Sequence, residues 1–404
     1  MTARMDTEPI RPARACPVCA GTIATLLQRM VFLLPDDHPL ADRYGIVRCS
    51  ACGFVYADTA STQADYDRYY AELSKYSDTA TGTGAGHQDW DRARLKDTAA
   101  FVAESLGDRA SRVVDIGCAN GGLLAEFLDL GFQRLVGVDP SAACAASATA
   151  IPGVSGYIGS IFDLPDEVHD VDCVVLSHVL EHVRDVPEAL RILRRVLRPG
   201  GIAYVEVPDA TRYAQFLIAP FQDFNVEHIN HFSALSLANA LRRAGFAVER
   251  TRGKAISASA TATYPAVGVI ARAVDDGSHA LERDAPLGDA IIEYIDRSRE
   301  ALGVVQAHLD RALADVSEIV IWGTGQTTLT VLSNVRLSPR VVALTDSNTR
   351  YHGRRLGGIP IVPPEQLGEF DVPIVVGSLI SHLAIEHRIR QLGLPNRTIR
   401  LSPT

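Results

Sequence analysis

The stretch that decides the fold is VVDIGCANGG, residues 113–122. An apolar pair leads into Asp115 and then into a turn with three glycines, and residues 123–130 follow with helical spacing. The pattern predicts strand, turn and helix, because glycine lets a backbone pass close to a bound ligand. A second apolar run, 135–138, ends in Asp139, and a carboxylate at that place can accept both hydroxyls of a ribose. The two runs together therefore indicate a nucleoside site.

The spacing of the glycines indicates which nucleoside. The turn reads D-x-G-x-x-x-G, whereas a dinucleotide fingerprint reads G-x-G-x-x-G and prepares helix amides for a pyrophosphate. This order resembles motif I of class I S-adenosylmethionine (SAM) methyltransferases, whose ligand carries a sulfonium and an amino-acid tail that suit an acidic residue. The turn taken alone also fits an unliganded βαβ crossover. The residues that we expect to bind the cofactor are Asp115, Gly117, Cys118, Ala119, Gly121, Asp139, Pro140, Asp163, Ser177 and His178.

Elements further along the chain extend this resemblance. Asp163 occupies the place from which methyltransferases of this class contact the adenine amino group, and residues 171–177 predict a strand that is buried on both faces. A helix over 186–197 and the turn RPGG precede a strand over 202–207. The LRPGG turn also resembles that class, which implies a Rossmann-like seven-stranded α/β sheet. Strands over 246–251 and 263–271 would close this sheet as an antiparallel pair.

Composition limits the classes of function. A chain of 404 residues exceeds one core of usual size, so we expect two or three domains. The net charge of −9 argues against a nucleic-acid binder, although a local basic patch could survive that average, and we expect a small-molecule substrate. No run approaches a membrane span, and the first fifteen residues lack the apolar core of a signal peptide. We therefore expect a cytoplasmic enzyme without a membrane contact.

Two C-x-x-C pairs near the N-terminus predict a metal site. Cys16 and Cys19 form the first pair, and Cys49 and Cys52 form the second about thirty residues later. Four thiolates complete the tetrahedron that zinc prefers, and with no open coordination position the ion would be structural. A redox C-x-x-C is the competing interpretation, but two pairs in this arrangement favour zinc.

The stretch after the second pair is rich in tyrosine, with Tyr66, Tyr69, Tyr70 and Tyr76. These side chains are expected either to line a polar substrate pocket or to belong to a helix that packs on the next domain. In SHVLEHV, His178 and His182 have a spacing that could pair two imidazoles on a metal. Because Glu181 is not where the H-E-x-x-H motif needs it and a loop is expected here, we predict instead that His182 faces the substrate.

The stretch FQDFNVEHINHFS, residues 221–233, carries the acid–base candidates. His228 is the best general base because its ordinary pKa lies near neutrality, and Glu227 or His231 would orient or tune it. Asn225 or His231 would bind a substrate oxygen. Ser233 is expected to cap a helix over 234–244.

The last ninety or so residues predict a second α/β unit. A helical connector over 288–314 leads to a strand over 318–322, the turn GTGQTT, a helix ending at 334 and a strand over 341–345 followed by Asp346. Arginines then stand beside a glycine turn, where they either hold a diphosphate or lie on the surface. They are Arg350, Arg354 and Arg355.

This order of parts resembles the sugar C-methyltransferases that act on nucleotide-linked keto-deoxysugars. The resemblance implies four parts, which are a zinc module with a tyrosine-rich connection at 1–85, a SAM core at 86–275, a connector at 276–315 and a Rossmann-like substrate domain at 316–404. The family's catalytic loop resembles Tyr-His-Glu-His, so Glu227 and His228 match, whereas Asn225 and Val226 depart. The resemblance also implies that Tyr76 and His182 contact the sugar.

The departure at Asn225 bears on the acceptor atom. Carbon methylation needs an enolate whose oxygen is stabilised by a donor or a cation, and an asparagine amide replaces a phenol only partly. We predict methyl transfer to a carbon beside a ketone with His228 as base. Methylation of oxygen or nitrogen, or a non-catalytic interaction protein with a vestigial SAM fold, are the alternatives.

Overall fold

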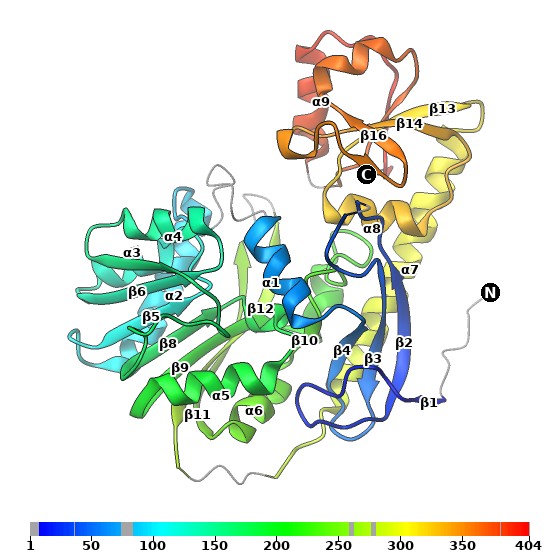
Figure 1. Cartoon of the computed structure of the whole chain (residues 1–404). Helices are drawn as coiled ribbons and strands as arrows, with labels where there is room; N and C mark the ends of the chain where they lie inside the picture. Colours follow the sequence, from blue (N-terminus) through cyan, green and yellow to red (C-terminus); the bar gives the residue numbers. More distant parts are fainter. Residues whose placement is uncertain are drawn as a thin grey trace. The chain divides into compact units, whose positions relative to one another are not determined.

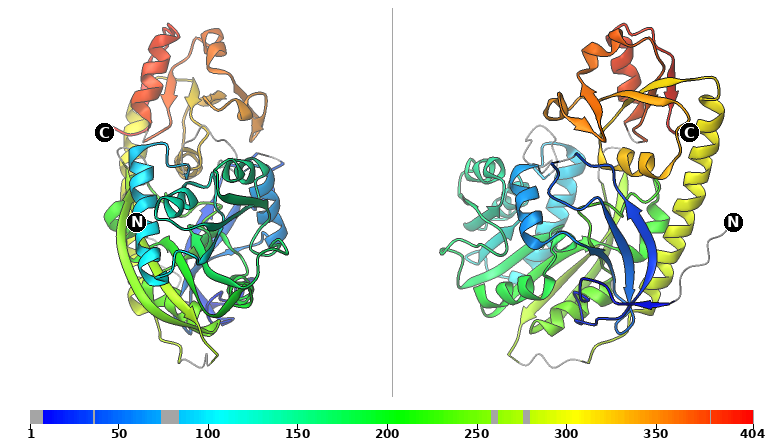
Figure 2. Two further views of the ribbon diagram at one scale, coloured as in Figure 1. Left: turned by 90° about the vertical axis from the view of Figure 1, so that its left-hand side faces the viewer. Right: turned by 45° about the vertical axis from the view of Figure 1, so that its right-hand side comes forward.

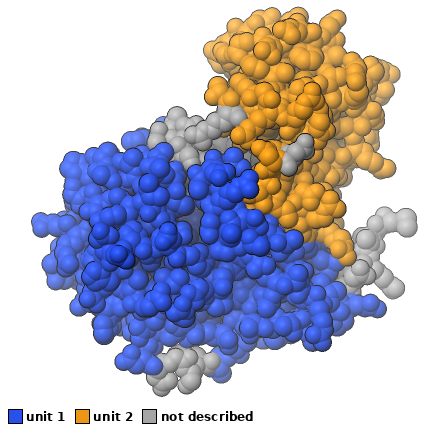
Figure 3. All heavy atoms as spheres, viewed as in Figure 1, with its two compact units in different colours: residues 1–28, 45–216, 227–291 blue, residues 29–44, 217–226, 292–404 orange. Residues whose placement is uncertain are grey.

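The computed structural model describes residues 8–35, 37–73, 84–257, 262–275, 280–379 and 381–403. The described chain divides into two compact units, coloured separately in Figure 3. The first comprises residues 1–28, 45–216 and 227–291, and the second comprises 29–44, 217–226 and 292–404. The predicted zinc module and the predicted core thus lie largely in one unit.

A seven-stranded mixed sheet organises the first unit, in the order β11-β12-β9-β8-β5-β6-β7. The strands from β9 to β7 run parallel, and β12 and β11 close the sheet as an antiparallel pair, which confirms the predicted fold class. The bounds are β5 Arg112–Ile116, β6 Arg134–Asp139, β7 Val154–Ile158, β8 Val171–Ser177, β9 Leu197–Pro208, β11 Phe246–Ser257 and β12 Thr263–Ala273.

Helices cover both faces of this sheet (Figure 1). One face carries α2 Asp89–Leu106, α3 Gly122–Asp129 and α4 Ala142–Thr149, and the other carries α5 Val186–Val196 and α6 Ala234–Arg243. Val102 of α2, Leu124 of α3 and Val175 of β8 share one apolar cluster. Because β8 is buried on both sides, its sequence is a nearly continuous apolar run.

Two local predictions have different outcomes. Ser233 caps α6, since its hydroxyl accepts the Ser236 N–H at 3.0 Å, as predicted. The segment RPGG, in contrast, is not a separate turn. It belongs to β9, which begins at Leu197, and Gly200 there has a φ of 75° beside an irregular register between β8 and β9. A glycine with positive φ lets the strand bend without ending.

A five-stranded sheet joins the N-terminal segment to the region before α6, in the order β1-β2-β3-β4-β10. The strands are β1 Pro9–Ile10, β2 Ala24–Val31, β3 Arg43–Cys49, β4 Val55–Thr59 and β10 Asn230–His231. In β10, Asn230 pairs with Tyr56 of β4. Helix α1 Gln63–Glu72 follows β4 and has a capping box formed by Thr62 and Asp65. The loop before β10, which holds Glu227 and His228, is therefore anchored on the N-terminal strands.

The second unit contains a six-stranded sheet in the order β15-β16-β14-β13-β17-β18, which confirms a second α/β unit. Figure 2 shows α7 Ala285–Ala312, which precedes it, as one continuous helix. The remaining elements are β13 Glu318–Trp322, α8 Gln326–Asn334, β14 Arg340–Thr345, β15 Arg355–Leu356, β16 Ile359–Val362, β17 Ile374–Val376, α9 His382–Gln391 and β18 Thr398–Arg400. Within the described ranges, no helix has the length and apolar character needed to cross a membrane.

Candidate functional site

The glycine turn between β5 and α3 has the close backbone approach that the sequence predicts. Gly117 has a φ of 78°, and a Cβ on it would lie 2.5 Å from a methyl carbon of Val179. Gly121 has a φ of 80° and a similarly crowded position beside Ala148. Ala119 also has a positive φ, 47°, which is uncommon for a residue with a Cβ. The turn is therefore a tight cradle whose backbone faces the end of β6.

Asp139 closes this cradle from the end of β6. One carboxylate oxygen accepts the Ala119 N–H at 2.9 Å, and the other accepts the Ser141 N–H at 2.9 Å. Burial raises the pKa of Asp139, although these amide bonds act in the opposite direction. The carboxylate is thus fixed in orientation, as a ligand for a ribose diol requires.

Asp115 and Asn120 provide the orphaned polar atoms of the cradle. Asp115 is buried, and one of its carboxylate oxygens has no hydrogen-bond partner among the described residues. Burial, followed by the charge of Asp139, raises the pKa of Asp115 to about 7. The amide nitrogen and oxygen of Asn120 are buried and equally unpartnered within the described chain. Such groups fit a ligand with a cationic and polar tail, and we did not foresee Asn120 from the sequence.

The other predicted cofactor residues are distributed around the same sheet edge. Cys118 is buried within the turn, and Pro140 follows Asp139 directly. Asp163 is exposed, in a short turn after Gly159, whose N–H donates to the Asp139 carbonyl at 3.1 Å. Ser177 ends β8. These positions surround the cradle, and their contact with a cofactor stays a prediction.

His178 is held between two buried carboxylates. Its Nδ1 lies 3.1 Å from Glu181 and its Nε2 lies 3.2 Å from Glu206. Burial alone lowers the pKa of His178, but the hydrogen bonds to both carboxylates outweigh it, so the pKa is raised. Lys254 also pairs with Glu206 at 2.6 Å. This network, which the sequence did not reveal, gives His178 internal partners on both ring nitrogens.

Two of the three predicted catalytic histidines come together. The rings of His182 and His228 pack edge to face with centroids 4.9 Å apart. His182 Nδ1 lies 3.0 Å from the Glu227 carbonyl oxygen, which makes Nδ1 the protonated nitrogen of the neutral ring. Both rings are half-buried, so they line the site and retain solvent access. The loops that carry them are joined by the Ile229 N–H, which donates to the Glu181 carbonyl at 3.0 Å.

Glu227 receives two phenol hydroxyls from α1. Tyr69 donates to one carboxylate oxygen at 2.9 Å, and Tyr70 lies 3.4 Å from the other. Tyr70 also packs its ring against His182, with centroids 5.6 Å apart. The sequence prediction named both the crowded tyrosines and Glu227, but it did not connect them.

His231 is buried in β10, and the structure does not place Asn225 or Tyr76 relative to this cluster. His231 is fully buried in β10 beside Tyr213, and burial followed by the charge of Arg14 lowers its pKa to about 3. A neutral ring without solvent access cannot bind substrate, which argues against the role predicted for it. Asn225 belongs to the second unit, where its amide donates to the Gln222 carbonyl at 3.4 Å. Tyr76 lies outside the described residues.

Arg14, just before the first C-x-x-C pair, forms hydrogen bonds with the loop that follows His182 and with the segment that follows His228. Its guanidinium donates to the carbonyls of Arg184 at 2.6 Å and Ile229 at 3.2 Å, and to the side chain of Asn230 at 2.8 Å. Burial lowers the pKa of Arg14 to about 10. A cation buried among carbonyls holds the loop of Arg184 and the loop before β10 in one arrangement, and its sequence context gave no signal of that role.

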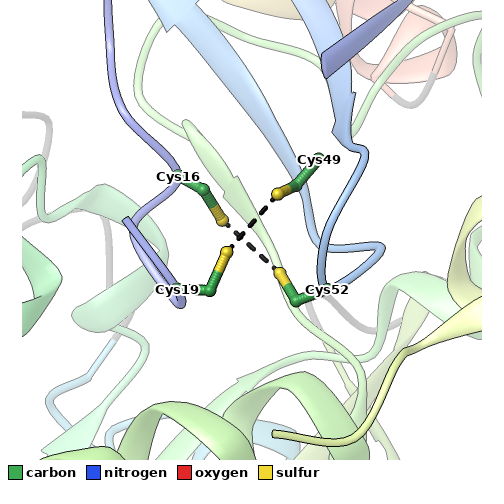
Figure 4. A group of neighbouring side chains, drawn as sticks. All are labelled: Cys16, Cys19, Cys49 and Cys52. Carbon is green, nitrogen blue, oxygen red and sulfur yellow. Dashed lines mark hydrogen bonds between the residues drawn. The ribbon is translucent and has the colours of Figure 1, made fainter. Parts of the chain in front are cut away.

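The four cysteines converge on one point (Figure 4). Cys16 and Cys52 have sulfurs 3.5 Å apart, and Cys19 and Cys49 have sulfurs 3.4 Å apart. Tetrahedral zinc with bonds of about 2.3 Å separates its sulfurs by about 3.8 Å, so the cluster fits that ion. A Cβ at Gly21 would lie 3.1 Å from one sulfur and 3.2 Å from another, which explains the glycine after the first pair.

One further group of side chains in the described part of the chain could hold a metal ion. The ligand atoms of Glu181, His182 and His228 lie within 4.8 Å of one another. We predicted no metal for His178 and His182 because Glu181 is not where the H-E-x-x-H motif needs it and a loop was expected, and that prediction did not consider His228. An imidazole that coordinates a metal cannot at the same time accept a proton, so a bound ion would compete with the role of His228 as a base.

In the second unit, Asp346 follows β14 and accepts the Thr324 N–H at 2.7 Å and the Asn348 N–H at 2.9 Å. Arg354 is half-buried, and Arg355 is exposed with its guanidinium on the Gly358 carbonyl. The side chain of Arg350 lies outside the described part. A diphosphate site on these arginines stays a prediction.

Two protein families match parts of the chain. Residues 87–251 match a family described as a methyltransferase domain. Residues 316–400 match a family described as C2185-like, N-terminal. The first match runs from α2 into β11 and leaves out β12 of the seven-stranded sheet, and the second covers the six-stranded sheet.

Individual relatives agree with the first match. A "Probable S-adenosylmethionine-dependent methyltransferase" of Mycolicibacterium smegmatis is 32% identical over 204 residues, which are 50% of this chain and 65% of that protein. A tRNA U34 carboxymethyltransferase of Azotobacter vinelandii is 31% identical over 36% of this chain and 48% of its own. The chain therefore spans less than two thirds of either relative.

Several solved structures can be superimposed on part of the chain. The 1,6-didemethyltoxoflavin-N1-methyltransferase of Burkholderia thailandensis, which was solved with S-adenosylhomocysteine, superimposes with a TM-score of 0.41 and 20% identity. The superposition covers 56% of this chain and 97% of that one.

Proposed function

We propose that this chain, whose residues 87–251 form a class I SAM-dependent methyltransferase domain, methylates a nucleotide-linked keto-deoxysugar on the carbon beside its ketone. The observation that carries the proposal is the packing of His228 against His182 in loops joined directly to each other. An imidazole with neighbouring rings and a buried carboxylate nearby is suited to remove a weakly acidic proton.

The cradle would hold the cofactor through groups of this chain. Asp139 would accept the ribose hydroxyls, and the unpartnered oxygen of Asp115 would face the positive charge of the ligand. Asn120 would bind the polar tail. When bound, SAM supplies an electrophilic methyl group on its sulfonium.

The substrate side would be built from the two joined loops. His228 would take the proton beside the ketone, and His182, whose Nδ1 is tied to the Glu227 carbonyl, would keep the His228 ring in place. Glu227 would tune the site through its carboxylate, which Tyr69 and Tyr70 orient. The role of the four-cysteine cluster would be structural, since four thiolates leave zinc no open position.

Methylation of a hydroxyl or an amine is the second candidate. It is favoured by Asn225 and Val226, which replace the tyrosine and histidine of the family that the loop resembles. A heteroatom acceptor needs a base and an aligned methyl group but no stabilised enolate. The same histidine would then deprotonate the acceptor itself.

The test is mass spectrometry of the protein with SAM and a panel of nucleotide-linked 4-keto-deoxysugars, with deuterium exchange at the carbon beside the ketone followed in parallel. We expect a gain of one methyl, with exchange and transfer both lost in His228→Ala and unchanged in the control His169→Ala, an exposed histidine of the same domain. Reaction of a hydroxyl or amine substrate without any exchange would favour the second candidate. No reaction with any of these substrates would contradict both.

A further inference from the structure

We propose that Glu181, His182 and His228 form a metal site, distinct from the cysteine cluster, that binds one divalent transition-metal ion of the zinc type. The ligand atoms of these side chains lie within 4.8 Å of one another, and all three residues belong to the first unit. The site goes beyond the proposed function, because binding of the ion does not depend on the substrate. Its effect on turnover rests on the proposed function, since His228 would be both ligand and base.

Glu181 supplies a buried carboxylate that is not fully satisfied. The residue is 1% exposed, and its Oε2 has no hydrogen-bond partner within the described residues. Its Oε1 lies 3.1 Å from Nδ1 of His178, which orients the carboxylate. A buried carboxylate oxygen without a donor is costly, and a bound cation would satisfy it. Glu181 is therefore a ligand that is fixed in orientation.

His182 has the outer contact that is usual for a metal-ligating histidine. Its Nδ1 lies 3.0 Å from the Glu227 carbonyl oxygen, so in the neutral ring Nδ1 donates and Nε2 carries the lone pair. Metal-ligating imidazoles commonly donate their other N–H to a backbone carbonyl, which fixes the ring. Nε2 is also the nitrogen that lies 3.8 Å from Oε1 of Glu181. The lone pair and the carboxylate thus lie near the same point.

His228 comes to these ligands from a different loop. Its ring packs edge to face on His182, with centroids 4.9 Å apart. The neighbouring Ile229 N–H donates to the Glu181 carbonyl at 3.0 Å, which ties the backbone beside His228 to the backbone of Glu181. Coordination uses one ring nitrogen, and a protein contact at the other nitrogen is common among metal ligands. The third ligand is therefore placed by a backbone hydrogen bond between the two loops.

The donor set indicates the kind of ion. Two imidazoles and one carboxylate suit zinc, cobalt and nickel, whereas magnesium and calcium prefer oxygen ligands. Ligand atoms about 2.0–2.1 Å from a tetrahedral ion lie about 3.3 Å apart, so this group would close slightly around the ion. Three protein ligands leave a tetrahedral ion one open position, whereas the four thiolates of the cysteine cluster leave none.

An ion in this site would prevent His228 from acting as a base. An imidazole nitrogen whose lone pair is coordinated cannot take a proton from a substrate. We therefore expect the bound ion to suppress deuterium exchange and methyl transfer, and a chelator to restore both. The ligand set leaves the cradle of Asp115 and Asp139 untouched, so SAM affinity should stay unchanged.

The test is a titration of the full chain with Co²⁺, after addition of an equimolar amount of Zn²⁺ for the cysteine cluster. Metal content and visible absorption are the readouts. We expect one cobalt ion per chain with the ligand-field bands of nitrogen and oxygen ligands. The thiolate-to-cobalt charge-transfer band, which would report cobalt in the cysteine cluster, should be missing from this signal.

Matched variants assign the ligands. Glu181→Gln should weaken cobalt binding by at least about a hundredfold, since loss of an outer partner alone costs about 10–100-fold. Glu206→Gln, which removes the other carboxylate from His178, should cost less than about tenfold. His182→Ala, with the exposed His169→Ala as its control, gives a second comparison of the same kind. SAM affinity reports that each variant is folded.

The outcomes separate this inference from the proposed function. A wild-type protein that binds cobalt only through thiolates, or equal losses in Glu181→Gln and Glu206→Gln, would overturn the site. Bound cobalt that leaves exchange beside the ketone of the 4-keto-deoxysugars unchanged would overturn His228 as a ligand. Absence of exchange before cobalt is added would overturn the carbon-methylation proposal, while the cobalt titration decides the metal site separately.

Discussion

The two glycine turns of this protein share several backbone contacts and differ in the residue that stands two positions before the first glycine. In the first, the Gly117 N–H donates to the Val138 carbonyl at 2.7 Å, and Asp139 accepts a turn amide. In the second, the Gly323 N–H donates to the Thr345 carbonyl at 2.8 Å, and Asp346 accepts a turn amide. Both aspartates also accept the N–H two residues further on.

The difference lies two residues before the first glycine. There the first turn has Asp115, which pairs across the sheet with Gly137, and the second has Ile321, which pairs with Leu344. Ile321 and Leu344 belong to an apolar cluster, whereas Asp115 has an unpartnered oxygen among the described residues. Both turns thus have the strand-end aspartate, and only the first also has a buried acid, as we expect of a turn that binds a cationic ligand.

The largest expected effect is a loss of SAM affinity on substitution of Asp139 but not of Asp346, the two aspartates at the strand ends. Asp139→Ala should weaken SAM binding by about a hundredfold or more, because it removes the ribose acceptor and the anchor of the turn. Asp346→Ala should leave SAM affinity unchanged. Calorimetric titration of both variants checks this, and equal losses would break the comparison.

Asp115→Asn tests the role of the additional acid in the first turn through the pH dependence of protein stability. Burial raises the pKa of Asp115 to about 7, so between about pH 4 and pH 7 the folded state holds a proton that the unfolded state has released. The stability of the wild-type protein should therefore fall as pH rises through this window and level off above it. At about pH 8 the ligand-free variant should be more stable by about 2–4 kcal/mol and bind SAM more weakly. Thermal unfolding at about pH 5 and pH 8 with and without SAM is the check, and a variant less stable than wild type at the higher pH would refute the assignment.

Arg14→Met tests whether a change in the loops that contain Arg184 and Ile229 affects turnover without affecting SAM binding at the glycine turn. Its guanidinium holds the Arg184 and Ile229 carbonyls and contacts no described residue of the glycine turn. We expect kcat to fall by about tenfold, the effect of one or two lost hydrogen bonds, while the SAM affinity stays within about twofold. Arg109→Met, which removes an arginine packed on Phe132, serves as a control. A parallel loss of SAM affinity would mean that Arg14 stabilises the whole unit instead.

The smallest effect concerns the second unit. Arg354→Ala should raise KM for the nucleotide-linked substrate by about three- to tenfold through loss of one charge-assisted contact, with SAM affinity unaffected. Steady-state kinetics measures both, with exposed Arg311→Ala as the matched control. Unchanged KM would assign the arginines to the surface.

The sequence predicted the fold well because its strongest signals are local. The apolar run of β8, the glycine turn and the cap at Ser233 each depend on neighbours in the chain, and each is confirmed. The separate RPGG turn was wrong because a glycine with positive φ can continue a strand as well as end one.

The site was less predictable because its contacts are remote in sequence. Tyr69 meets Glu227 across 158 positions, and Arg14 meets Ile229 across 215. His231 is buried because it pairs with Val55 of β4, and no pattern in the neighbouring sequence predicts that pairing. Residue types near the chemistry could be named, but which of them face one another follows only from tertiary structure.

The most direct test of the central claim is the number of SAM molecules bound per chain. Isothermal titration with SAM should give a stoichiometry of one in the wild-type protein and in Asp346→Ala, and an affinity weaker by about a hundredfold or more in Asp139→Ala. A stoichiometry of two, or a single site lost in Asp346→Ala and kept in Asp139→Ala, would contradict the assignment of the cofactor to the first turn.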